Sequence, residues 1–103
     1  MFTDKWADFL IAKVRYNPQE THIERVLVYE DKGDTLGGSS EQLRLEVVAN
    51  LKSGKKYVTI YKNKDNKWEK GAEVYIITIK GQEFIKTERD ETPKDNLGKL
   101  PRF

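Results

Sequence analysis

Residues 10–30 read LIAKVRYNPQETHIERVLVYE and predict two strands joined by a turn. Residues 10–16 alternate apolar and polar side chains with a period of two, which is typical of a strand with one buried face. The turn falls at residues 17–20, because Pro18 fixes its own φ and disfavours helix in the residue before it. Residues 22–30 are rich in β-branched side chains and predict the second strand.

The alternation in this second strand is interrupted. Apolar side chains stand at Ile23 and Val26 rather than two residues apart. One extra residue in a strand shifts its alternation in this way. The pattern therefore predicts a bulge near Glu24 and Arg25.

A single helix is expected after a loop at residues 31–38. Ser39 and Gln42 have the spacing of a capping box, so we expect the helix to begin at Ser39. Lys52 and Gly54 are typical of a helix end. One face of this helix is apolar and would pack on a sheet; it consists of Leu43, Val47, Val48 and Leu51.

Three more strands are expected in the second half of the chain. Residues 57–62 alternate, and a polar loop at residues 63–71 leads to the apolar run at residues 73–80. This run is too apolar for a strand with one wet face, which favours a central and well-covered position. Lys80-Gly81-Gln82 is typical of a tight hairpin turn, and Phe84 and Ile85 lie in the returning strand.

The expected order is therefore β-β-α-β-β-β. This order predicts an α+β fold in which one helix packs on a curled, largely antiparallel five-stranded sheet. A more strongly curled, barrel-like sheet is the alternative. The chain has 103 residues and a mass of 12.0 kDa, so we expect a single small domain over residues 1–103.

Composition argues against most catalytic sites. The chain has no cysteine and one histidine, which excludes thiol nucleophiles, disulfides and thiolate zinc sites. No nucleophile motif surrounds a serine, and His22 has no catalytic partner that the sequence identifies. We therefore expect no enzymatic activity, no cofactor and no metal ion.

Positive charge is concentrated in residues 52–70. This segment has seven lysines and two acidic residues, within a chain whose net charge is +2. Lysines that neutralise phosphates and aromatic rings that stack on bases are the two parts of a single-stranded nucleic-acid site. The block lacks arginine, and a solvated strand edge guarded by lysines is the alternative interpretation. The candidate nucleic-acid face consists of Lys55, Lys56, Tyr57, Tyr61, Lys62, Lys64, Lys67, Trp68 and Lys70.

The C-terminal tail, residues 89–103, ends in several apolar side chains. Chain ends fray unless something holds them, and exposed leucine or phenylalanine side chains forgo the stability that burial supplies. The tail is therefore expected to pack on its own domain, and docking on a protein partner or a second copy is the alternative. The residues concerned are Leu97, Leu100, Pro101 and Phe103.

Three weaker patterns favour structural roles. The glycine-rich segment 33–40 lacks the lysine of a phosphate-binding loop, so an ordinary loop and helix cap is favoured. The acids at Glu30, Asp31 and Asp34 lack the spacing of a calcium loop. Trp6 and Trp68 each close a core edge or anchor an interface, and core closure is favoured.

The chain ending DNLGKLPRF, residues 95–103, resembles that of domain of unknown function 3892, an uncharacterised bacterial and archaeal family. The segments VRY at residues 14–16, IERV at 23–26, SGKKY at 53–57 and FIKT at 84–87 are similar in order and spacing. This resemblance implies a compact domain in a prokaryotic or phage setting. It brings no known activity, cofactor or catalytic residue.

Two functions follow as hypotheses. The first is a non-enzymatic binding or adaptor module that acts through protein contacts or self-association. The alternative is a nucleic-acid-binding module that uses residues 55–70. We expect a cytoplasmic location and no membrane association, because no segment has the pattern of a signal peptide or a spanning helix.

Overall fold

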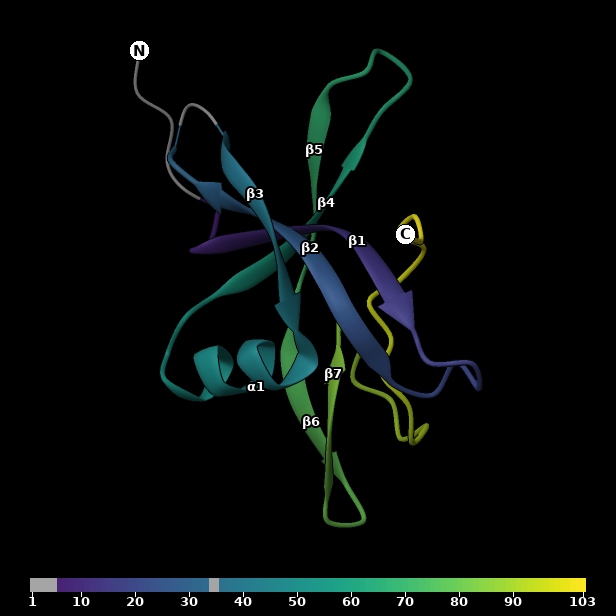
Figure 1. The fold of residues 1–103 in the computed structure, drawn as a ribbon. Coiled ribbons are helices and arrows are strands. Elements are labelled where there is room, and N and C mark those ends of the chain that lie inside the picture. Colours follow the sequence, from purple (N-terminus) through teal and green to yellow (C-terminus); the bar gives the residue numbers. More distant parts are fainter. Residues whose placement is uncertain (1–5, 34–35) are drawn as a thin grey trace.

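The computed structural model describes residues 6–33 and 36–103, which form one helix and seven strands (Figure 1). In chain order these elements are β1 (Phe9–Tyr16), β2 (Ile23–Asp31), β3 (Leu36–Leu43), α1 (Arg44–Lys52), β4 (Tyr57–Lys62), β5 (Trp68–Glu73), β6 (Tyr75–Ile79) and β7 (Gln82–Lys86).

The strands form two sheets. The larger sheet has the order β3-β2-β1-β4-β5, and β6 and β7 form a separate two-stranded sheet. β1 pairs in parallel with β4, whereas the other pairs are antiparallel. One helix with two sheets agrees with the α+β class. The larger sheet has five strands, and all its pairs but β1–β4 are antiparallel, as expected. The expected element order was wrong, since β3 precedes the helix and β6 and β7 form a separate sheet, and the expected curl is not confirmed.

The segment expected to be a loop and the start of the helix is strand β3. Ser39 and Ser40 lie opposite Tyr29 and Val28 of β2, so Ser39 does not cap a helix. Pairing with the free edge of β2 satisfies the backbone polar groups of this glycine- and serine-rich segment, whose own propensity for strand is low. Helix α1 begins only after Leu43.

Helix α1 begins at a different residue from the one expected, but it ends where expected. The backbone N–H of Leu43 donates to the Glu46 carboxylate at 3.2 Å, which replaces the expected cap at Ser39. Gly54 has a φ of +99°, and its N–H donates to the Leu51 carbonyl at 3.2 Å. The predicted stop at Lys52 and Gly54 is therefore confirmed.

A second strand was missed, since β5 begins at Trp68 within the polar loop expected at residues 63–71. β5 pairs with β4, and Trp68 lies opposite Lys62. The turn between them is held by the Asn63 side chain, whose oxygen accepts from the N–H groups of Asp65 (2.8 Å) and Lys67 (3.1 Å). Pairing across the hairpin outweighs the polar composition of β5.

The apolar run at residues 73–80 is not the central strand. β1 occupies the centre of the larger sheet, and β6 belongs to the small one. The chain leaves the larger sheet at Val74, which is buried and donates its N–H to the Tyr57 carbonyl at 2.9 Å. Within this run, Val74 belongs to the buried core and Ile76 packs against it.

The bulge predicted near Glu24 is confirmed. Arg25 lies opposite Arg15, whereas Ile23 lies opposite Tyr16, so Glu24 is the extra residue. A second irregularity occurs in β1, where Ile11 and Lys13 lie opposite the adjacent residues Val28 and Leu27.

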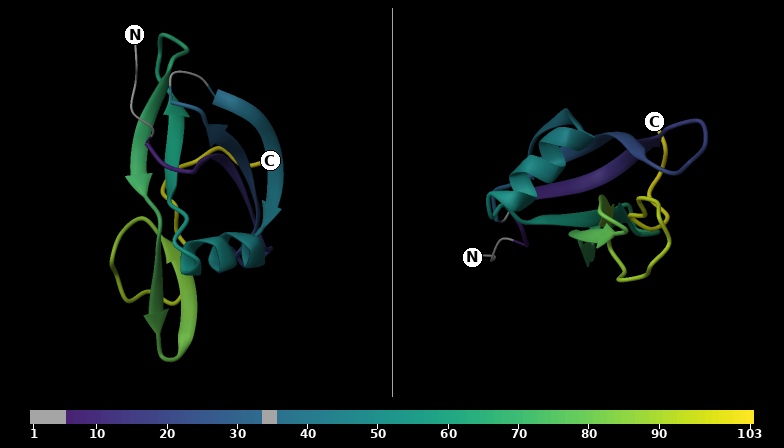
Figure 2. Two further views of the ribbon diagram at one scale, coloured as in Figure 1. Left: turned by 90° about the vertical axis from the view of Figure 1, so that its left-hand side faces the viewer. Right: turned by 90° about the horizontal axis from the view of Figure 1, so that it is seen from below.

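Buried apolar side chains form two clusters on the two faces of the larger sheet. The larger cluster joins the sheet to α1, to β7 and to the C-terminal tail through Val47, Ile85 and Leu97. Figure 2 shows α1 lying across the ends of β3 and β4, with β6 continuing the ribbon of β5. We call the face with the smaller cluster, which includes Leu10 and Ile60, the outer face.

Candidate functional site

A groove opens where β1 and β4 diverge. Their parallel pairing ends at the Ile11–Thr59 pair. Beyond that pair the C-terminal tail takes the edge of β1, since the N–H of Val14 donates to the Pro101 carbonyl at 3.0 Å. The groove has a volume of about 500 Å³ and lies between β1, β4, β5 and the tail. It is lined by Ala12, Lys13, Tyr29, Tyr61, Lys62, Trp68, Lys99 and Pro101.

Three aromatic side chains form the apolar part of this groove. Trp68 and Tyr29 are half-buried, with ring centroids 5.7 Å apart and planes tilted by 56°. Trp68 packs on the smaller core cluster, which confirms the prediction that it closes a core edge. Tyr61 is 45% exposed and lies at the rim, where it also lines a neighbouring hollow beside Leu97 and Leu100.

Three lysines surround these rings. Lys13 comes from β1, Lys62 from β4 and Lys99 from the tail, and all three are exposed. The Lys62 ammonium lies 5.1 Å from the centre of the Trp68 ring, within the range of a cation–π interaction. The groove therefore combines flat apolar walls with exposed positive charges at its mouth.

Positive charge continues across the outer face. Residues directly opposite on neighbouring strands project from the same face. Arg15 and Arg25 form such a pair beside Lys13, and Lys70 lies opposite Ile60 of the smaller cluster. Both arginines have partners, because Glu41 lies 3.7 Å from Arg25 and Arg15 donates to the Phe103 carbonyl at 2.7 Å. The outer face is basic around the groove.

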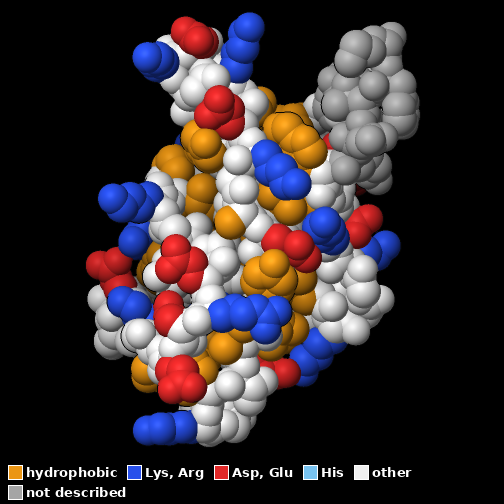
Figure 3. All heavy atoms as spheres, turned by 180° about the vertical axis from the view of Figure 1, so that it is seen from behind, with side chains coloured by type: hydrophobic (Ala, Val, Ile, Leu, Met, Phe, Trp, Pro, Cys, Tyr) orange, Lys and Arg blue, Asp and Glu red, His pale blue; other side chains and the backbone are white. Residues whose placement is uncertain are grey.

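The tip of the β4–β5 hairpin carries charges of both signs. Lys64 and Lys67 flank Asp65 there, and all are exposed. Seen from behind in Figure 3, the tip projects at the top, and hydrophobic patches lie below it between lysine and arginine side chains. The hairpin thus extends the charged surface beyond the groove.

The predicted nucleic-acid face is only partly brought together. Tyr61, Lys62 and Trp68 line the groove, Lys70 lies on the outer face, and Lys64 and Lys67 lie at the hairpin tip. Lys55 and Lys56 instead line a separate hollow beside α1 and β6.

Tyr57 was wrongly included in that face, because its side chain is fully buried. Its ring stacks on Phe9 at 5.1 Å, and its hydroxyl hydrogen-bonds Gln42 and Asn50. Burial raises the pKa of Tyr57. The alternation of β4 placed Tyr57 on the exposed side, but α1 covers that face of the sheet at Tyr57.

We expect Tyr57→Phe to lower the free energy of unfolding by about 1–3 kcal/mol, because the buried Gln42 oxygen loses its donor. Urea denaturation followed by circular dichroism measures the difference. Tyr61→Phe is the matched control, since Tyr61 is exposed and should change stability by less than about 0.5 kcal/mol. Equal losses in the two variants would contradict the role of the buried hydroxyl.

The Tyr61 hydroxyl also has a partner. It hydrogen-bonds the Glu69 carboxylate, and this bond raises the pKa of Tyr61. Tyr61 and Glu69 lie opposite each other on β4 and β5. The Glu69 carboxylate thus lies near the Tyr61 hydroxyl at the groove rim.

Sequence reasoning missed Lys13, Tyr29 and Lys99. Lys13 and Tyr29 looked like ordinary strand residues, and Lys99 looked like a polar interruption of the apolar tail. The alternation of β1 did indicate that Lys13 would be exposed. No local pattern indicates that these three residues meet, because the order of the strands and the course of the tail bring them together.

The tail is part of the core. Leu97 and Leu100 are buried in the larger cluster, Phe103 is half-buried and Pro101 is exposed. The N–H of Phe103 donates to the Val14 carbonyl at 3.2 Å, so the tail follows β1 to its end. The alternative of a free docking segment built on Leu97 and Leu100 was wrong.

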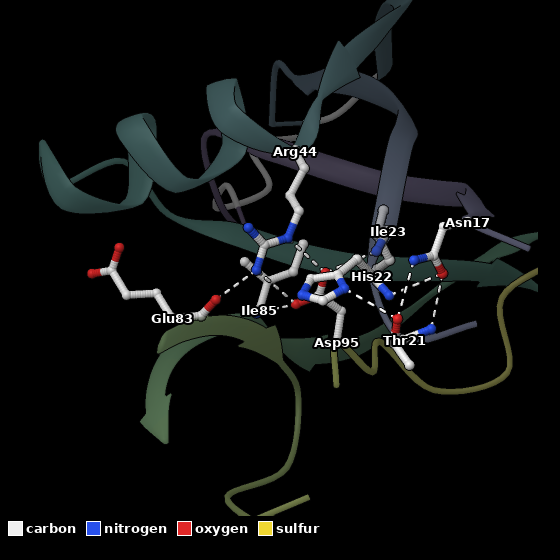
Figure 4. A network of polar contacts seen from close by, with 8 residues as sticks. All are labelled: Asn17, Thr21, His22, Ile23, Arg44, Glu83, Ile85 and Asp95. Atoms are coloured by element: carbon white, nitrogen blue, oxygen red, sulfur yellow. Dashed lines mark hydrogen bonds and ion pairs between the residues drawn. The ribbon is translucent and has the colours of Figure 1, made fainter. Parts of the chain in front are cut away.

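Asp95 anchors this tail at the centre of a buried network (Figure 4). Its carboxylate, whose side chain is 0% exposed, accepts from the N–H groups of Ile23 (2.8 Å) and Ile85 (2.9 Å). It also accepts from Arg44 at 2.7 Å and 3.0 Å, and Arg44 donates further to the Glu83 carbonyl at 2.6 Å. Asp95 thus joins β2, α1 and β7.

Other polar side chains singled out from the sequence also have structural partners. Asp31 accepts from the N–H groups of Trp6 (2.6 Å), Ala7 (3.2 Å) and Gly33 (2.8 Å), which occupies its carboxylate. Asp34, which was weighed with Asp31 as a cation ligand, lies outside the described residues. The ring of His22 lies 3.1 Å from the Thr21 hydroxyl and 5.5 Å from the Phe84 ring centre.

Buried Lys86 is likewise engaged. Its ammonium donates to the Asp90 carboxylate and to the Thr92 carbonyl, which closes the loop after β7. The bond from Lys86 lowers the pKa of Asp90. Among residues 6–33 and 36–103, no three potential metal ligands cluster together, and no helix there could span a membrane.

A model of the family described as "Protein of unknown function (DUF3892)" matches residues 10–101. The chain belongs to this family. The match spans every strand and the helix except the first residue of β1, and it includes most of the groove-lining tail. No curated protein and no solved structure matches the chain.

Proposed function

We propose that this DUF3892 domain is a non-enzymatic binding module for nucleic acid. The observation that carries the proposal is the groove, where Tyr61 and Trp68 lie beside Lys13, Lys62 and Lys99. Phosphates are neutralised by lysines, and bases stack on aromatic rings. The outer face adds Lys70, which would extend the path of a phosphate backbone.

Nucleic acid is favoured over a protein partner because the protein-docking hypothesis rested on an exposed tail, and Leu97 and Leu100 of the tail are buried. A cytoplasmic location, expected from the sequence, would bring the domain into contact with nucleic acid. A protein partner or a second copy is the second candidate. The exposed side chains of Leu43 (43%) and Leu45 (75%) at the start of α1 favour that candidate.

We expect Lys13→Glu combined with Lys62→Glu to weaken binding of labelled oligonucleotides and to flatten its dependence on salt. Each phosphate contact contributes roughly 0.7 to the slope of log K against log salt for single strands, so the slope should fall by about 1.4. Fluorescence anisotropy at a series of salt concentrations measures both quantities.

Lys80→Glu is the matched control. Lys80 is an exposed lysine in the β6–β7 turn, at the opposite end of the molecule from the β4–β5 hairpin (Figure 1). It should leave the slope unchanged, although the change in net charge is half as large. An unchanged slope in the double variant would reject the groove as the site. Absence of binding even at low salt would reject nucleic acid and leave the protein-contact candidate.

A further inference from the structure

The groove has a feature that a merely basic surface lacks, namely aromatic walls large enough to hold a planar ring. Tyr61 is exposed at the rim, and Trp68 and Tyr29 meet at 56° to form a corner rather than a parallel slot. One flat ring can therefore stack on one wall while its edge contacts another. A volume of about 500 Å³ is in the range of small-molecule sites.

The positions of the lysines complement such a ring. Lys13 and Lys99 approach the groove from β1 and the tail, and Lys62 approaches from β4 on the other side. Lysine is a point charge on a flexible stem, so these side chains can follow phosphates on either side of an inserted base. Lys62 now lies over Trp68 and could move to a phosphate when a base covers that ring.

Base sequence is not read by this arrangement. The residues that line the groove provide no arginine, asparagine or glutamine, which are the side chains that form paired hydrogen bonds with base edges. Stacking is tolerant of sequence because every base has a π face. The aromatic rings of the groove can therefore contact the face of any base, and its lysines can contact the neighbouring phosphates.

From these observations we infer that the groove captures one unpaired base of a single strand and that Lys13, Lys62 and Lys99 hold the adjacent phosphates. This inference rests on the proposed function and makes it more specific. Bases within a duplex are stacked and paired, so their faces are closed to Tyr61 and Trp68. The domain therefore binds single strands in preference to duplexes, with little preference among sequences.

An abasic strand separates base capture from charge attraction. We expect a labelled strand of about 10 nucleotides to bind roughly ten- to a hundredfold more tightly than an abasic strand with the same number of phosphates, because stacking on aromatic side chains is lost. The comparison uses fluorescence anisotropy at one salt concentration. DNA and RNA strands of the same sequence are tested together, with the matching duplex and a nucleoside monophosphate as competitors.

Two variants assign the effect to the groove. Tyr61→Ala should reduce the ratio between the two strands several-fold, whereas Tyr61→Phe keeps the ring and should keep the ratio. In Trp6→Phe the remaining tryptophan is Trp68, whose fluorescence should change with the base-bearing strand and not with the abasic one.

The outcomes distinguish this inference from the proposed function. Equal binding of both strands would overturn base capture while leaving a lysine-based nucleic-acid site in place. Duplex binding as tight as single-strand binding, or competition by the monophosphate at the same concentration as the strand, would also overturn it. Failure of every oligonucleotide to bind at low salt would overturn the proposed function itself.

Discussion

The Asp95→Asn variant is expected to lose about 3–5 kcal/mol of its free energy of unfolding, the loss typical of breaking a buried ion pair. The Asp95 carboxylate accepts four hydrogen bonds, two of them from Arg44. An amide of the same size presents an NH₂ group to two of these donors. It also leaves the Arg44 guanidinium without a counter-charge. Because small domains are stable by only about 5–15 kcal/mol, this loss would bring the chain close to unfolding at room temperature.

Urea denaturation followed by circular dichroism measures this loss, and a double-mutant cycle assigns it. Arg44→Met alone should also destabilise, because it leaves a buried carboxylate without its cation. The double variant should lose less than the sum of the two single losses, since the Asp95 and Arg44 side chains interact directly. Asp65→Asn, at the exposed hairpin tip, is the matched control with a change below about 0.5 kcal/mol. Additive losses would show that the pair is not coupled.

The elements that the sequence predicted correctly are those with a local signal. β1, β2, β4 and the β6–β7 hairpin have alternating or apolar runs, and the bulge at Glu24 left a visible slip in the pattern. β3 and β5 have no such signal. Each is held by hydrogen bonds to the strand before it, so its conformation depends on this pairing and not on a pattern in its own residues.

The same distinction applies to the candidate site. Lysines and aromatic residues of the β4–β5 hairpin could be grouped from one sequence segment, because a hairpin brings its own two strands together. Lys13 and Lys99 are 86 positions apart and meet only because the tail takes the edge of β1 where β4 leaves it. Without an indication that β1 and β4 are parallel neighbours, the groove could not be predicted.

The C-terminal tail has a structural role that its sequence only partly identified. The segment that most resembled the family ending, residues 95–103, contains Asp95 at the centre of the buried network and two core leucines. Gly98 has a φ of +82°, a conformation that suits glycine, and its N–H donates to the Asn96 side chain at 2.9 Å. These features belong to a segment that completes the fold, and Lys99 extends from it into the groove.

Deletion of residues 97–103 should therefore abolish cooperative folding. Two buried leucine side chains would be lost, each worth about 2–5 kcal/mol when truncated to alanine, together with the hydrogen bonds along β1. Circular dichroism during thermal and urea unfolding should show no sharp transition. Leu97→Ala and Leu100→Ala should each give intermediate losses that locate the effect in the core.

Lys99→Ala separates this structural role from the binding role of the same segment. Lys99 is exposed, so its truncation should change stability by less than about 0.5 kcal/mol while weakening oligonucleotide binding. A deletion variant that unfolds at the same urea concentration as the full chain would contradict the packing of the tail. Such a result would favour Leu97 and Leu100 as a docking segment. The deletion would then remove the tail residues that line the groove without unfolding the domain.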